Sequence, residues 1–168
     1  MNKADVLHLF NYMYWANSRL LEAAAALPRD QFVEPGTVTT RDLRATLVHE
    51  LDVEWSWRLA LQGTSSEEFD ALPDLRPEDY ADVAALREHW VRDEADMRAW
   101  LAQMTDDQLA ADATPALSGR ALPMWRFLLH ICFHAAQQQA DAATLLTLRG
   151  RSPGDLGYLE WLNAVGYG

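Results

Sequence analysis

Two histidines stand one helical turn apart in an apolar segment, WRFLLHICFHAAQQQADAA, in the last third of the chain. Residues four apart on a helix share a face, so His130, His134 and Gln138 could direct polar atoms toward one place. Burying imidazoles without partners costs free energy, so these side chains need partners. Because two imidazoles at this spacing can reach one divalent ion, the segment predicts a metal site.

His49, far upstream in TLVHELDVEWSWRLA, is the candidate partner for this segment. Its neighbours on one helix face are small or polar, which leaves room for a cavity. A partly buried histidine satisfied by one hydrogen bond is the alternative interpretation. A site of His49, His134 and Gln138 would bind zinc or nickel less well than three histidines, because an amide oxygen is a poorer ligand. His130 could complete the set instead if the helix is suitably rotated.

Other residues near these histidines carry weaker signals. Glu54 lies in the tryptophan-rich run VEWSW, where a buried carboxylate needs a partner, and a structural salt bridge is favoured over a general base. Gln137 and Gln139 flank the polar face and are interpreted as helix-favouring surface residues. Cys132 is expected to be a small buried hydrophobe without a chemical role, and as the only cysteine it excludes an internal disulfide.

Four long segments have the three- and four-residue apolar spacing of amphipathic helices. They cover residues 3–27, about 42–62, 83–104 and 123–149. Thr39 and Asp42 predict a capping box before the second helix, and Thr105 and Gln108 predict another before a short turn at 106–111. Residues 64–79 read as a long loop, and 112–122 as a turn or small hairpin. The tail from 151 onward carries enough apolar residues to pack back on the body.

These elements predict an all-α fold, an up-down four-helix bundle with a long connection between the second and third helices. The chain has 168 residues, of which 49% are hydrophobic. That size suits one domain, residues 1–168, with an adequate core.

Composition argues against several classes of partner. The formal net charge is −11 with only 14 Lys and Arg, which argues against a phosphate-backbone binder and gives DNA repair no physical support. No run approaches the roughly 20 apolar residues that span a bilayer, and the first residues lack a clean signal-peptide region. We therefore expect a cytoplasmic protein without membrane contact. Aromatic side chains on the first two helices favour a homodimer.

Three segments together resemble the DinB/YfiT-like family of bacterial four-helix bundles: NYMYWANSRLL, LVHELDVEWSWRL and PMWRFLLHICFHAAQQQADAATLLTLRGRSPGDLGYLEWL. The resemblance places the family's first metal ligand on His49 and its second on His134. The third falls on Gln138, where the family usually has histidine. His130 matches a position that in the family is usually near the site rather than in it.

The resemblance also implies an activity. Characterised members include metal-dependent thiol transferases that use bacillithiol or mycothiol, so the expectation is a thiol S-transferase, or a related hydrolase, with nickel or zinc at the histidines. Its partners would be a small-molecule thiol and an electrophile. With Gln138 in the third place the ion would bind weakly or be absent. The alternative is a metal-free bundle that binds a small ligand or serves a stress response.

Overall fold

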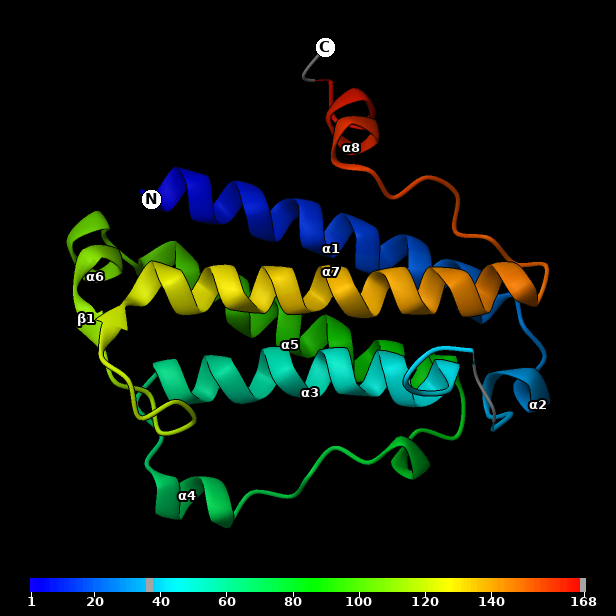
Figure 1. The fold of residues 1–168 in the computed structure, drawn as a ribbon, viewed down its shortest axis with the longest axis horizontal. Coiled ribbons are helices and arrows are strands. Elements are labelled where there is room, and N and C mark those ends of the chain that lie inside the picture. The colour runs from blue at the N-terminus through cyan, green and yellow to red at the C-terminus, as the bar shows by residue number, and fades with distance from the viewer. Residues whose placement is uncertain (36–37, 167–168) are drawn as a thin grey trace.

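The computed structural model describes residues 1–35 and 38–166, and four long helices packed side by side form its body (Figure 1). These are α1 (Lys3–Ala25), α3 (Leu43–Leu61), α5 (Val83–Gln103) and α7 (Met124–Leu148). The short elements are α2 (Arg29–Phe32), α4 (Ser66–Asp70), η1 (Pro77–Asp79), α6 (Asp106–Ala110), β1 (Asp112–Ala113), β2 (Leu122–Pro123) and α8 (Tyr158–Ala164). The predicted all-α bundle is confirmed.

The long connection between α3 and α5 determines the direction of the helices. It includes α4 and η1 and carries the chain back along the bundle, so that α3 and α5 run the same way (Figure 1). Helices α1 and α7 run the opposite way, and each of them packs against a helix of the other pair. The order is therefore up, down, down, up, and α7 lies antiparallel to α3 along its length.

The start of α3 differs from the expected capping box. Asp42 itself is the N-cap, and its carboxylate accepts a hydrogen bond of 2.8 Å from the backbone N–H of Ala45. Thr39 lies three residues before that cap and donates its hydroxyl to the carbonyl of Arg41. The expectation for Thr39 was wrong because the helix begins just after Asp42. The second expected box, Thr105 with Gln108, is confirmed at the start of α6.

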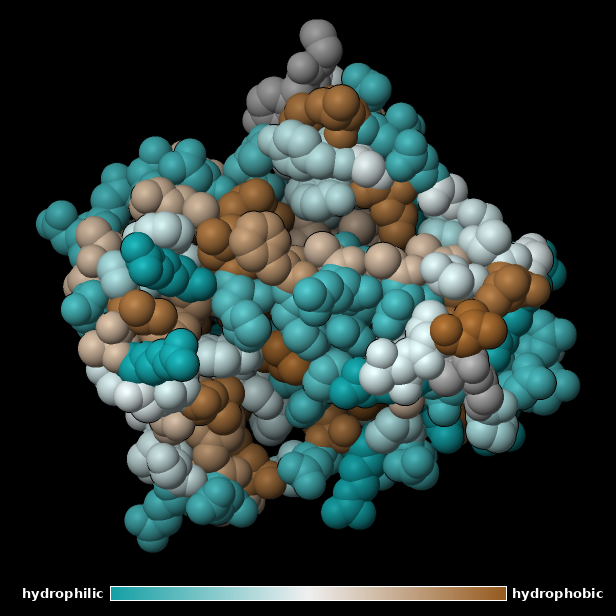
Figure 2. Space-filling model, viewed as in Figure 1, coloured by the Kyte–Doolittle hydropathy of each residue, from teal (hydrophilic) through white to brown (hydrophobic). Residues whose placement is uncertain are grey.

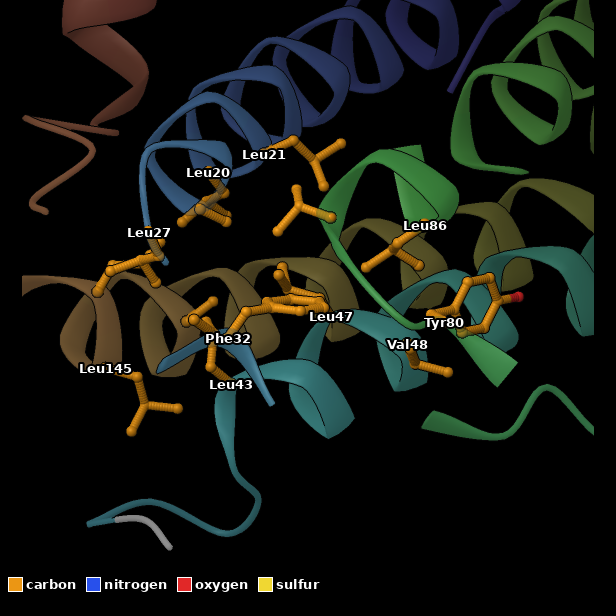
Figure 3. Packing of buried hydrophobic residues seen from close by; sticks show 14 of the residues in the cluster. Leu20, Leu21, Leu27, Phe32, Leu43, Leu47, Val48, Tyr80, Leu86 and Leu145 are labelled. Carbon is orange, nitrogen blue, oxygen red and sulfur yellow. The ribbon is translucent and has the colours of Figure 1, made fainter. Parts of the chain in front are cut away.

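The apolar core has two parts, one at each end of the bundle. The first gathers around Leu20, Leu47, Leu86 and Leu145, one residue from each long helix (Figure 3). The second gathers around buried residues of the opposite ends, among them Phe10 and Met97. Each side chain of this kind contributes roughly 1.5–3 kcal/mol by leaving water.

Between these two clusters lies a layer of buried polar side chains, here called the central polar layer. All are at most 6% exposed, and they come from all four long helices: Asn17, Glu50, Glu54, Arg58, Asp93 and Gln139. Burying a polar group without a partner costs free energy, and each of these side chains forms at least one hydrogen bond. The candidate metal ligands lie beside it on α3 and α7.

The remaining segments close the two ends. Residues 112–113 and 122–123 pair as the expected small antiparallel hairpin. In the tail, Trp161 of α8 is buried. The Tyr12 hydroxyl of α1 donates a hydrogen bond of 2.8 Å to the carbonyl of Leu156. The tail therefore packs back on the body as predicted. Among the described helices, none is long and apolar enough to cross a membrane.

Candidate metal centre

The antiparallel packing of α3 against α7 brings two of the predicted ligands close together. His49 of α3 and His134 of α7 lie with their Nε2 atoms 3.2 Å apart. Their ring centroids are 4.9 Å apart and the ring planes cross at 75°. Figure 2 shows the face on which α7 lies in front, where hydrophilic residues gather over the middle of that helix. Both histidines are half-buried.

The separation of the two nitrogens suits a shared ion. Two imidazoles bonded to one tetrahedral zinc at about 2.0–2.1 Å hold their nitrogens roughly 3.3 Å apart. The observed 3.2 Å agrees with that value. The same separation also suits a direct N–H···N hydrogen bond between two neutral rings of complementary tautomer.

Both rings are held in the neutral form that binds metals. Burial, and then the neighbouring His49, His130 and Arg41, lower the pKa of His134 to about 4. Burial, and then Arg41, also lower the pKa of His49. Since an imidazole must be unprotonated to ligate, these rings need release no proton at pH 7.

Gln138 lies one turn beyond His134 on α7 and has an unused acceptor. The residue is 8% exposed, and its Oε1 atom has no hydrogen-bond partner among the described residues. A buried acceptor left unpaired costs about 1–3 kcal/mol. Imidazole nitrogens and an amide oxygen are donor types that a divalent ion accepts, so the chemistry of these three side chains fits such an ion.

His130 lies one turn before His134, on the exposed side. Its ring centroid is 6.3 Å from that of His134, and the edge of Trp57 of α3 packs against it at 5.1 Å. Within the described part of the chain, no three residues drawn from His, Cys, Asp and Glu lie close enough together to hold a metal. The buried Gln138, one turn beyond His134, and the exposed His130, one turn before it, are the two candidate third donors.

A family model for the DinB family matches residues 1–164. The chain belongs to the DinB family. The match includes all four long helices and hence every candidate ligand. A comparison with curated proteins gives no match. The resemblance seen in the sequence is confirmed at the level of the family.

Directly behind the histidines of this DinB bundle, Gln139 ties three helices together. Its amide nitrogen donates to Asn17 Oδ1 at 2.6 Å on α1 and to Glu50 Oε1 at 3.3 Å on α3. Interpreting Gln139 as a surface residue was wrong, because it points into the central polar layer, whereas Gln137 is exposed as expected. Because Glu50 follows His49 and Gln139 follows Gln138, this contact fixes the backbone on both sides of the site.

Glu50 is a buried carboxyl of the central polar layer. Burial, and then the nearby Glu54, raise the pKa of Glu50 well above its usual value, although hydrogen bonds from Gln139 and Asn17 oppose the shift. A protonated carboxyl costs far less to bury than a carboxylate. Burial therefore favours the protonated form of this carboxyl in the layer behind the histidines.

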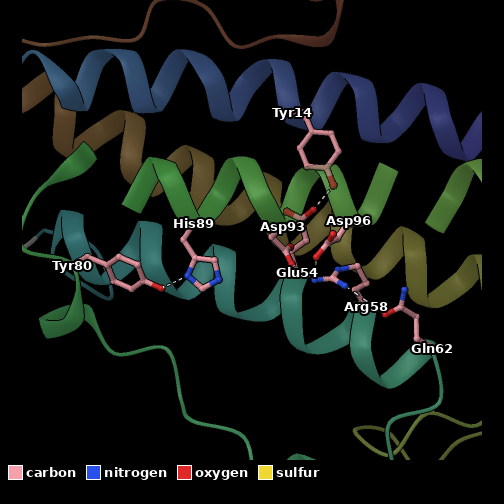
Figure 4. Close-up of polar contacts among 8 residues, drawn as sticks. All are labelled: Tyr14, Glu54, Arg58, Gln62, Tyr80, His89, Asp93 and Asp96. Carbon is pink, nitrogen blue, oxygen red and sulfur yellow. Dashed lines mark hydrogen bonds and ion pairs between the residues drawn. The ribbon is translucent and has the colours of Figure 1, made fainter. Parts of the chain in front are cut away.

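Glu54 of the central polar layer points toward Tyr14 of α1 (Figure 4). Its carboxyl accepts a hydrogen bond from the Tyr14 hydroxyl of α1. Burial, and then Asp93, raise the pKa of Glu54 to about 8. The expected salt bridge is wrong for this residue, since Arg58 one turn further on α3 pairs with Asp93 and, at 3.5 Å, with Asp96. Both ion pairs join α3 to α5.

Cys132 adds no reactive group to the site. Burial, and then Glu54, raise the pKa of its thiol to about 12. The thiolate, which is the nucleophilic form, is therefore negligible at neutral pH. This agrees with the role expected from the sequence.

Proposed function

We propose that this DinB-family protein is a metal-dependent thiol S-transferase. Its divalent ion, nickel or zinc, would be held by His49, His134 and Gln138. The observation that carries the proposal is the 3.2 Å approach of two imidazole nitrogens, with a buried amide oxygen that has no partner among the described residues on the next turn of α7. Three protein donors leave a position open, which is the arrangement of catalytic rather than structural sites.

When bound, the ion would supply Lewis acidity that lowers the pKa of a low-molecular-weight thiol such as bacillithiol or mycothiol. The chain favours an anionic sulfur there, because the three donors are neutral and Arg41 adds positive potential at both rings. In the transfer, a sulfur–carbon bond forms and the leaving group departs with its electron pair. The thiol proton passes to solvent.

The central polar layer contributes positioning. The contacts of Gln139 with Asn17 and Glu50 fix the axial position of α7 relative to α1 and α3. Groups that bind an ion must be held to within about half an ångström of their working geometry. This network would therefore keep His49 and His134 in register.

A metal-free bundle that binds a small ligand is the second candidate. It is favoured by Gln138, a weaker donor for zinc or nickel than histidine. It is also favoured by the nitrogen separation, which suits a hydrogen bond between His49 and His134 without an ion. In this state the pair would be a structural contact between α3 and α7.

Metal content distinguishes the two candidates. Untagged protein is dialysed against nickel or zinc and analysed for bound metal, alongside the variants H49A and H134A. One ion per chain in the wild type, lost in both variants, supports the transferase. The matched control is H89A, because His89 lies on α5 and contacts Tyr80 at 2.7 Å. A wild type that binds no metal, or binds it equally well as H134A, would reject the metal site.

Activity provides the second test. Metal-loaded wild type should accelerate the conjugation of bacillithiol or mycothiol to chlorodinitrobenzene, and H134A should not. If metal-loaded protein does not accelerate the conjugation, the metal site would stand but the proposed transferase activity would be rejected.

A further inference from the structure

A hollow of about 430 Å³ opens where α3 meets the first turns of α7, and His130 forms part of its lining. Its wall is formed by α3, by the loop between β1 and β2, and by the first turns of α7. The residues that matter for its chemistry are Trp57, Arg120, Arg126, Phe127 and His130. This volume suits a small organic molecule.

The hollow is adjacent to the candidate metal centre. His130 forms part of its wall, and the His134 ring lies one turn further along α7, with the centroids 6.3 Å apart. Trp57 packs its edge against His130 at 5.1 Å, so α3 closes the other side. A molecule in the hollow would lie next to whatever occupies the open position at His49 and His134.

The charge of the hollow is opposite to that of the protein. The chain has 25 acidic residues and a formal net charge of −11, yet the wall carries two arginines and no carboxylate. Neither guanidinium forms an ion pair with a described residue, and Arg126 lies over the ring of Trp125 at 5.4 Å. A concave surface of one sign concentrates ligands of the opposite sign.

The rest of the wall is aromatic. The rings of Trp57 and Phe127 are stacked, with centroids 5.5 Å apart and planes 24° from parallel. Flat apolar surfaces of this kind bind flat apolar ligands, while planar guanidinium groups match the geometry of a carboxylate. The hollow therefore combines an apolar floor with two donors for an anion.

We propose that this hollow binds the acceptor substrate and that the substrate is a small organic anion, an apolar or aromatic body carrying a carboxylate. Its role as the acceptor site rests on the proposed thiol transfer. Its binding chemistry does not, because the two arginines and the aromatic pair are present whether or not an ion is bound. The carboxylate would contact Arg120 and Arg126, and the body would lie along Trp57 and Phe127.

The test is the binding of 2-naphthoate, measured by titration calorimetry, with neutral 2-naphthamide as the comparison. The double variant R120Q/R126Q should weaken naphthoate about tenfold, since a charge-assisted hydrogen bond to a carboxylate is worth that factor or more. It should leave naphthamide unchanged. The control R87Q/R151Q removes the same two positive charges from exposed positions, one on α5 and one beyond the end of α7, and should bind naphthoate as the wild type does.

The variant H49A/H134A separates this proposal from the metal site. It should bind no metal but should retain naphthoate. Wild type that fails to bind naphthoate, or R120Q/R126Q that binds it unchanged, would overturn the anion site whatever the metal analysis shows. Equal weakening by R87Q/R151Q would also overturn it, because the effect would then reflect net charge alone.

Discussion

Replacing Glu54 by glutamine should raise the free energy of unfolding, relative to the wild type, by more at neutral pH than at acidic pH. The carboxyl is buried, accepts the Tyr14 hydroxyl, and has its pKa raised from 4.5 to about 8. The folded state therefore holds a proton that the unfolded state releases above about pH 4.5. Stability from this group is fully present below pH 4.5 and is lost progressively as the pH rises to 8. Glutamine stays neutral and can still accept the Tyr14 hydrogen bond, so E54Q lacks this loss.

The size of the effect follows from the shift. Each pKa unit corresponds to about 1.4 kcal/mol, so between pH 5 and pH 7.5 the wild type loses about 3 kcal/mol that E54Q keeps. For a domain of this length, about 3 kcal/mol corresponds to roughly 6–12 °C in Tm. Comparing the two pH values cancels any constant difference between a carboxyl and an amide in the same position.

Urea unfolding followed by circular dichroism at pH 5 and pH 7.5 measures this difference. The control is E22Q, an exposed glutamate on α1, whose difference from the wild type should not change with pH. If the stability of E54Q relative to the wild type stays constant, or falls at pH 7.5, the raised pKa of Glu54 is refuted. A fall is the result that a salt bridge at Glu54 would give.

Three further changes test other parts of the structure. R58M should cost about 3–5 kcal/mol in urea unfolding at pH 7, because it leaves the buried Asp93 without its partner. Q138H should tighten zinc binding in a competition with a chromophoric chelator, because imidazole is the better ligand, and weaker binding would show that the third donor lies elsewhere. G154A should lower the Tm, because Gly154 has a φ of +82° and an added Cβ would lie 2.5 Å from Nη2 of Arg19. An unchanged melting curve would contradict that strain.

The long helices could be predicted from the sequence because their apolar spacing is regular. The residues that follow this spacing on the first helix are all buried: Val6, Phe10, Met13, Asn17, Leu20 and Ala24. The direction of α5 could not be read in this way, because it depends on where the long connection returns. Helix α8 was also unforeseen as a helix, since its seven residues are held by tertiary contacts of Trp161.

The histidine pair could be anticipated, but its surroundings could not. The spacing of His130 and His134 pointed to a site, and the antiparallel register of α3 and α7 supplied His49 opposite His134. Gln139 resembled a surface residue because glutamine is common on exposed helices. Only the packing of three helices shows that it bonds Asn17 and Glu50. Long-range hydrogen bonds of this kind leave no signal in local spacing.

An anomalous diffraction map of crystals soaked in nickel or zinc would test the metal centre most directly. One strong peak is expected at bonding distance, about 2.0–2.1 Å, from the Nε2 atoms of both His49 and His134, with the amide oxygen of Gln138 turned toward it. A map with no peak there, and with the two rings still joined by their hydrogen bond, would contradict the metal site.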